Sequence, residues 1–395
     1  MTHNLTWLKI CLAGTGCLLA ASLTGPAVTQ IPAAEVQLSV APADEKVGVL
    51  GFVVTEFTPV MNDQPNCPAG LNKNMSTLLL EAATPAERAR LSSDGGKRDL
   101  RMLAFRTPDG KGSLCVHPDA VTIPIPPLNV VEGNGRVRGL DLDGFPTLAR
   151  PRGKSCGHAN FVDAQGRQTI DNQFYRLNGC IQGKRKGGNA EQSNMSELIN
   201  GSYAIAIELV GVDNRKNDPD VTVNIYSSRD PTPFTATGKP LPNGSMNVHP
   251  NPRYHTSAHA RLVNGVLRSD PFDLVLDFPV AGAKLEYDMR EARIELTLKD
   301  DGTAEGLLAG YYPLNSYYKN QVTIGDHVFF GVGAADTIGF TCSAMHRALR
   351  QYADGLRDPK TGECGGISFA QTIKAMPTFV LKPQVVAASA STPRK

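Results

Sequence analysis

The densest set of residues that could bind a ligand lies between Cys156 and Cys180. The oxygen-bearing side chains of this segment include Asn160, Asp163, Asp171 and Asn172. Calcium takes roughly six to eight oxygen ligands from a loop that can fold around it, and Gly166 permits such a turn. The pattern therefore predicts a calcium site. Because the EF-hand spacing is absent, the alternative is an ordinary β-turn at Asp163 and a turn or helix cap at Asp171 and Asn172.

Three of the eight histidines, His249, His255 and His259, lie close together in the sequence. If residues 254–262 form a strand, His255 and His259 point to the same side, because side chains alternate. At a rise of about 3.3 Å per residue they lie some 13 Å apart along a straight strand. We therefore expect no shared metal ion. As catalytic candidates, His255 and His259 would each act singly, as a general acid or base beside a carboxylate.

The sequence lacks the local signatures of common enzyme classes. It has no G-x-S-x-G, no H-E-x-x-H, no P-loop and no C-x-x-C-H. Catalytic residues can still converge from distant segments, as the carboxylate pairs of glycosidases do. The absence of motifs therefore favours a binding protein without excluding an enzyme.

The first 34 residues have the pattern of a secretory signal. Lys9 precedes a nearly uncharged stretch, residues 10–29, and small residues follow up to Ala34. The strongly apolar core, residues 10–23, is shorter than the roughly 20 residues that a membrane-spanning helix needs. We therefore expect cleavage of residues 1–34, a periplasmic or secreted mature chain, and no membrane span after processing.

Six of the eight cysteines lie beyond the expected signal. An even number of cysteines in an oxidising compartment predicts disulfide bonds, and the absence of a C-x-x-C pair argues against zinc. Sequence alone does not determine the pairing. The simplest expectation joins sequence neighbours: Cys67–Cys115, Cys156–Cys180 and Cys342–Cys364.

The charge of the chain is nearly balanced. The expected mature chain carries 39 basic and 38 acidic side chains. This balance gives no electrostatic reason to expect nucleic acid as a partner, so we expect an extracellular ligand whose identity the sequence does not reveal.

Nine segments have the composition and alternation of β-strands. They are Val47–Phe57, Leu100–Arg106, Tyr203–Val212, Val221–Ser227, His255–Leu262, Phe272–Phe278, Lys284–Asp288, Ala292–Lys299 and Thr303–Gly310. Helical spacing predicts helices over Asn74–Leu91, with a new start at Pro85, and over Ser343–Leu356.

These elements predict a mainly β fold with some α: an antiparallel, jelly-roll-like β-sandwich with an N-terminal helical insertion and a C-terminal disulfide-stapled helix. The expected organisation is an α+β part over residues 35–150, a β-sandwich region with the C-terminal helix over residues 151–384, and a disordered tail over residues 385–395. The expected function is that of an exported, non-enzymatic binding protein with calcium as a structural ion. The alternative is a secreted hydrolase or lyase that uses carboxylates and histidines.

Overall fold

The computed structural model describes residues 48–147, 151–279, 284–323 and 335–382. Contacts divide the chain into two units, residues 1–39 and 40–395, and the first unit lies entirely outside the described residues. The expected signal at residues 1–34 and the expected tail at residues 385–395 also lie outside them.

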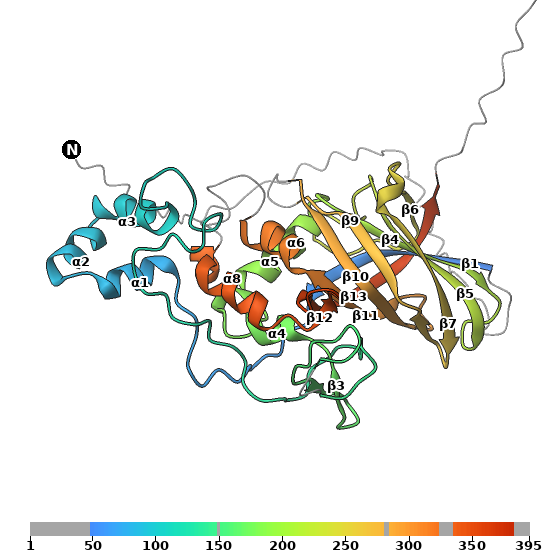
Figure 1. The fold of residues 1–395 in the computed structure, drawn as a ribbon. Helices are drawn as coiled ribbons and strands as arrows, with labels where there is room; N and C mark the ends of the chain where they lie inside the picture. Colours follow the sequence, from blue (N-terminus) through green and yellow to red (C-terminus); the bar gives the residue numbers. More distant parts are fainter. Residues whose placement is uncertain (1–47, 148–150, 280–283, 324–334, 383–395) are drawn as a thin grey trace, which may run out of the picture. The chain divides into compact units, whose positions relative to one another are not determined.

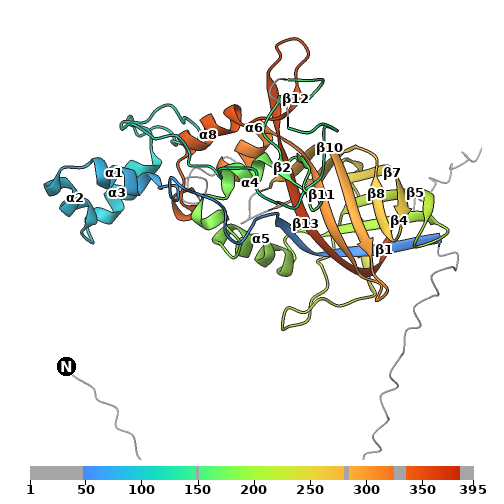
Figure 2. The same ribbon diagram turned by 90° about the horizontal axis from the view of Figure 1, so that it is seen from below.

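Eight antiparallel strands form a closed β-barrel (Figure 1 and Figure 2). Each strand pairs with the next barrel strand along the chain, and the last pairs with the first. In order they are β1 (Gly48–Pro59), β4 (Ile205–Val212), β5 (Asp218–Ser227), β7 (His255–Val263), β8 (Val266–Ser269), β10 (Glu286–Leu298), β11 (Ala304–Pro313) and β13 (Cys364–Leu381). The expected β-sandwich is therefore wrong, because one sheet closes on itself instead of packing against a second sheet.

Five further strands lie outside this ring. Three extend the barrel sheet: β6 (Gly244–Asn247) and β12 (Gly355–Arg357) pair with β13, and β9 (Phe272–Asp277) pairs with β10. The other two, β2 (Phe161–Val162) and β3 (Gln168–Ile170), form a separate hairpin.

Side chains of β11 alternate between two hydrophobic clusters. On β11, Ala304, Leu308 and Tyr312 belong to the main core, which contains the inward-facing side chains of the barrel. Leu307 and Tyr311 belong to a second cluster outside the barrel. An eight-stranded barrel is just wide enough for side chains to fill. The barrel interior is therefore core, and its outer wall on β11 supports other parts of the chain.

The helices come mainly from the long connections between β1 and β4 and between β11 and β13. They are α1 (Met75–Ala82), α2 (Pro85–Ser92), α3 (Gly96–Phe105), α4 (Gln173–Asn178), α5 (Asn189–Ile199), α6 (Leu314–Tyr317) and α8 (Cys342–Gln351). Shorter turns are η1 (Gln182–Lys184), η2 (Pro252–Tyr254) and the π-helical η3 (Tyr318–Thr323). Helices α4, α5, α6 and α8 gather at one end of the barrel, whereas α1 to α3 pack on one another (Figure 1).

The first predicted helix is confirmed as α1 and α2. Asn74 caps α1, Thr84 caps α2, and Pro85 occupies the first turn of α2. The second predicted helix is confirmed as α8. The predicted strand over residues 100–106 is wrong, because most of this segment lies in α3. Its Leu, Met, Ala and Arg residues favour a helix, and Gly96 allows close packing on the backbone of Arg90.

Three disulfide bonds join segments that are far apart in the sequence. They are Cys67–Cys180, Cys115–Cys342 and Cys156–Cys364, with Cα atoms 5.7, 4.9 and 6.3 Å apart. The expected neighbour pairs Cys67–Cys115, Cys156–Cys180 and Cys342–Cys364 are therefore wrong. The long β1–β4 connection packs against the segment from α8 to the start of β13, so two of the bonds, Cys115–Cys342 and Cys156–Cys364, join these two distant parts of the chain.

Peptide mapping of the purified protein under non-reducing conditions tests this connectivity. We expect three cross-linked peptide pairs that contain Cys67–Cys180, Cys115–Cys342 and Cys156–Cys364, and we expect reduction to separate them. Replacing both Cys67 and Cys180 by Ser should lower the free energy of unfolding by about 2–5 kcal/mol, because the reduced chain has a less restricted unfolded state. Recovery of any neighbour pair from natively folded protein would contradict this arrangement.

Candidate functional site

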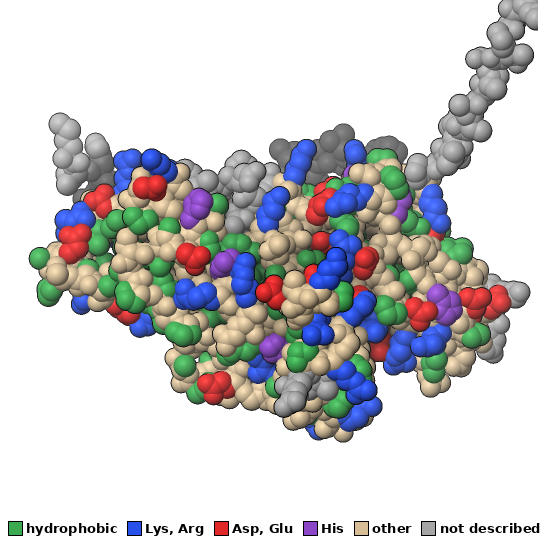
Figure 3. Space-filling view, in the orientation of Figure 1, with side chains coloured by type: hydrophobic (Ala, Val, Ile, Leu, Met, Phe, Trp, Pro, Cys, Tyr) green, Lys and Arg blue, Asp and Glu red, His purple; other side chains and the backbone are tan. Residues whose placement is uncertain are grey.

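A groove of about 720 Å³ borders the outer face of the barrel. Residues 131–147 and 151–172, which we call the lobe, supply most of its lining, and Asn62 together with β8, β10 and β11 supplies the rest. The lobe is anchored by apolar side chains that join the cluster outside β11, among them Val137, Phe161 and Ile170. Figure 3 shows Lys and Arg side chains gathered on the lobe around β3 and over neighbouring strands.

Four arginines line the groove. The Nε of Arg167 lies 2.7 Å from the Oδ2 of Asp163, and the Nε of Arg268 lies 2.8 Å from the Oε2 of Glu295. Two further arginines, Arg136 and Arg138, are exposed, and no carboxylate among the described residues forms an ion pair with either of them. Arg138 still interacts electrostatically with Glu305 at longer range. The groove thus presents two guanidinium groups without a described ion-pair partner.

The backbone places these two arginines on the same side of an extended segment. Val137 lies between them and is buried against the lobe core. Its N–H donates to the carbonyl of Val162, and the N–H of Val162 donates to the carbonyl of Gly135. Because side chains alternate in extended backbone, burial of Val137 turns Arg136 and Arg138 outward into the groove.

A buried arginine holds both walls of the groove in place. Arg176, from α4, is 7% exposed and stacks over the ring of Phe161 at 4.4 Å. Its guanidinium donates five hydrogen bonds, to Val131 O, Gly133 O, Asn134 Oδ1, Ala159 O and Gln173 Oε1. Burial lowers the pKa of Arg176, and none of these five partners is a carboxylate. The carbonyls that it binds precede Arg136 on one wall and β2 on the other.

An acidic cluster adjoins one end of the groove. Carboxylate oxygens of Asp141, Asp143 and Asp171 lie within 4.8 Å of one another. Asp171 is 3% exposed and accepts hydrogen bonds from the backbone N–H of Leu142 at 2.7 Å and from Nδ2 of Asn160 at 2.8 Å. Burial raises the pKa of Asp171 to about 9, and repulsion from other carboxylates, Asp354 first, adds to the effect. Asp171 is therefore protonated at neutral pH unless a cation neutralises the cluster.

The structure brings together only two of the four residues predicted to bind metal, Asn160 and Asp171. Asp163 begins a β-turn, accepts hydrogen bonds from backbone N–H groups at the turn and pairs with Arg167. The side chain of Asn172 caps α4. Sequence reasoning missed Asp141 and Asp143, although the Asp-Leu-Asp-Gly turn was a local signal for them. It also missed the arginines, because no motif marks them.

The predicted catalytic histidines lie on β7, and neither lines the groove. Nε2 of His255 contacts the carbonyl oxygen of His249. Nδ1 of His259 lies 2.9 Å from a carboxylate oxygen of Asp270, and its Nε2 lies 3.6 Å from one of Asp220. His255 and His259 thus have separate partners.

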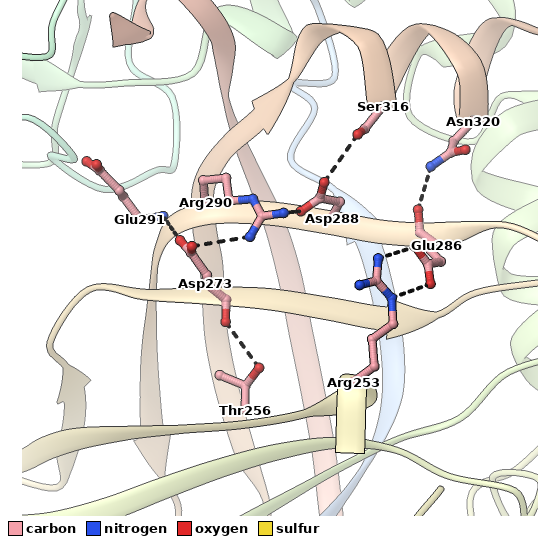
Figure 4. Close-up of polar contacts among 9 residues, drawn as sticks. All are labelled: Arg253, Thr256, Asp273, Glu286, Asp288, Arg290, Glu291, Ser316 and Asn320. Atoms are coloured by element: carbon pink, nitrogen blue, oxygen red, sulfur yellow. Dashed lines mark hydrogen bonds and ion pairs between the residues drawn. The ribbon is translucent and has the colours of Figure 1, made fainter. Parts of the chain in front are cut away.

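A second polar network joins β9, β10 and the helices at the capped end (Figure 4). Two nitrogens of Arg253 lie 2.7 Å from the carboxylate oxygens of Glu286. Arg290 reaches Asp273 at 3.2 Å and Asp288 at 3.0 Å, and polar groups from α6 and η3 complete the network. These carboxylates are already paired with arginines, and the hydrogen bonds from Ser316 and Asn320 link α6 and η3 to β10.

The raised pKa of Asp171 predicts a pH-dependent stability. The folded state holds this proton more tightly than the unfolded chain, so the stability it contributes is complete below about pH 4 and is lost as pH rises toward 9. Burial raises the pKa of Asp354 to about 7. Asp354 therefore contributes to the pH dependence of stability mainly below pH 7. Between pH 7 and 8.5, Asp171 should therefore make the free energy of unfolding of the wild type fall by up to about 1.4 kcal/mol per pH unit. Asp171→Asn should abolish this contribution.

Urea unfolding in EDTA across this pH range measures the slope. The exposed-site control Asp94→Asn should retain the wild-type slope, because the side chain of Asp94 is 99% exposed. If the free energy of unfolding depends on pH equally in wild type and Asp171→Asn, the carboxyl of Asp171 is not protonated in this pH range.

Replacing Arg176 by Lys tests its role in the lobe. Lysine keeps the charge but offers three donors, so two of the five oxygens lose their partner. At about 1–3 kcal/mol for each unsatisfied buried group, the free energy of unfolding should fall by about 2–6 kcal/mol. Chemical denaturation measures this loss, with Arg98→Lys on α3 as the control. A loss below about 0.5 kcal/mol would show that the guanidinium geometry is not required.

Comparison of the chain with protein-family models, curated proteins and solved structures found no match. In the part of the chain that the structure describes, no helix has the length and apolarity needed to cross a membrane. The function must therefore be argued from the chemistry of the groove.

Proposed function

We propose that this chain is a non-enzymatic binding protein of the periplasm or the extracellular space, and that it binds an anionic ligand in the groove. The observation that carries the proposal is the pair Arg136 and Arg138, held side by side without a carboxylate partner among the described residues. Guanidinium groups bind carboxylate and phosphate oxygens in a bidentate manner. A volume of about 720 Å³ falls in the usual range of small-ligand sites.

Two features support a location outside the cytoplasm. The pattern of residues 1–34 is typical of a secretory signal. The three disulfide bonds also favour an oxidising compartment. The Cys156–Cys364 bond further ties the lobe to β13 of the barrel, which reduces the ordering that a ligand must impose on binding.

The geometry supports binding better than hydrolysis or lyase chemistry. A general acid or base must reach the proton that it transfers. Both carboxylate oxygens of Asp171 already accept hydrogen bonds within the fold, and His255 and His259 do not line the groove. Calcium as a structural ion stays a prediction, with Asp171 as the one residue shared by the expected ligand set and the acidic cluster.

Substitution of both groove arginines tests the proposal. Isothermal titration calorimetry at low salt would use three anionic probes: citrate, a triglutamate peptide and a sulfated disaccharide. We expect wild type to bind at least one probe and Arg136→Ala/Arg138→Ala to bind it at least about tenfold more weakly, because a charged hydrogen bond contributes about 1.5–3 kcal/mol.

The matched control is Arg98→Ala/Arg101→Ala, which removes two exposed arginines from α3. This variant should bind like wild type. Failure of wild type to bind all three probes, or equal affinities of wild type and the groove variant, would overturn the proposal.

A further inference from the structure

The segment that carries the two groove arginines has one edge paired with β2 and a second edge that is largely unpaired. Val137 and Gly135 form the hydrogen bonds to β2 described above. In extended backbone, successive residues direct their N–H and C=O groups to opposite edges. The backbone polar groups of Arg136 and Arg138 therefore lie on the edge away from β2.

This second edge borders the groove. Nδ2 of Asn62 donates to the carbonyl of Arg136 at 3.0 Å from this side, and Asn62 itself lines the groove. Among the described residues, no hydrogen-bond partner contacts the N–H of Arg136 or either backbone group of Arg138. An unpaired edge of this kind is a template for an added extended chain.

The charges of the groove match an extended peptide better than a uniformly charged polymer. Arg136 and Arg138 are two residues apart, which corresponds to about 6–7 Å in extended backbone. Acidic side chains at positions i and i+2 of an extended peptide have the same spacing and face the same side. The groove also contains Asp141, which forms no ion pair with a described side chain and would repel a ligand that carries negative charge along its whole length.

We infer that the ligand is a short acidic peptide that adds as a strand to the open edge of residues 136–138, with carboxylates at i and i+2 on Arg136 and Arg138. This inference depends on the proposed function, because it requires the same groove and the same arginines. It adds two requirements: backbone hydrogen bonds from the ligand and alternating acidic residues.

Four capped peptides with the same residue composition test both requirements. The parent, acetyl-Ala-Glu-Val-Glu-Ala-amide, has its acids at i and i+2, and the second has them adjacent. The third is the parent with N-methyl groups on both Glu amides. The fourth is the parent with an N-methyl group on the central Val amide. We expect the parent to bind at least about fivefold more tightly than the adjacent-acid peptide, and Arg136→Ala/Arg138→Ala to weaken the parent at least about tenfold.

One methylated peptide should lose at least about tenfold in affinity while the other stays within about twofold of the parent, because alternate amides of an added strand face the edge. If the parent and both methylated peptides bind with equal affinity, or if both methylated peptides lose affinity equally, the ligand does not add as a strand. The proposed anion-binding groove would still stand if binding of these peptides depended on the two arginines. Equal affinity for adjacent acids, or binding of the sulfated disaccharide alone, would overturn the peptide inference only. Binding of none of the probes would overturn both proposals.

Discussion

The pairing of β1 with β13 is the interaction on which the rest of the structure depends. It joins strands more than 300 residues apart, with Phe52 opposite Pro377 and Pro59 opposite Gln371, and it turns an open meander into a closed barrel. Closure protects both strands, which would otherwise be unpaired sheet edges. It also lets the barrel interior fill with apolar side chains, so that the outer wall becomes a rigid support.

The groove depends on that support because the lobe has little regular structure of its own. Its hairpin is short, and its apolar residues become buried only together with the outward side chains of β11 and neighbouring segments. Buried polar groups in and beside the lobe form hydrogen bonds within the fold. Arg176 donates to carbonyl and amide oxygens, and Asp171 accepts from N–H groups.

These features would make the groove a preorganised site for the proposed ligand. Buried Val137 and the β2 hydrogen bonds fix the backbone of the arginine segment, so a ligand needs to order little of the protein beyond the two exposed side chains. Strand pairing by the same backbone would add directional hydrogen bonds to charge attraction, which alone is weakened by salt. The combination would provide both affinity and a defined ligand orientation.

Much of the secondary structure could be predicted from the sequence, because alternation and capping are local. Strands such as β4, β5 and β11 follow from their alternating apolar residues, and α1 and α2 follow from Asn74, Thr84 and Pro85. Only the tertiary structure decided four other features: barrel closure, disulfide connectivity, the meeting of Asp171 with Asp141, and the exposure of Arg136 beside β11. Each of these requires segments distant in the chain to meet, and a local pattern states which side of a strand is apolar but not which strand it meets.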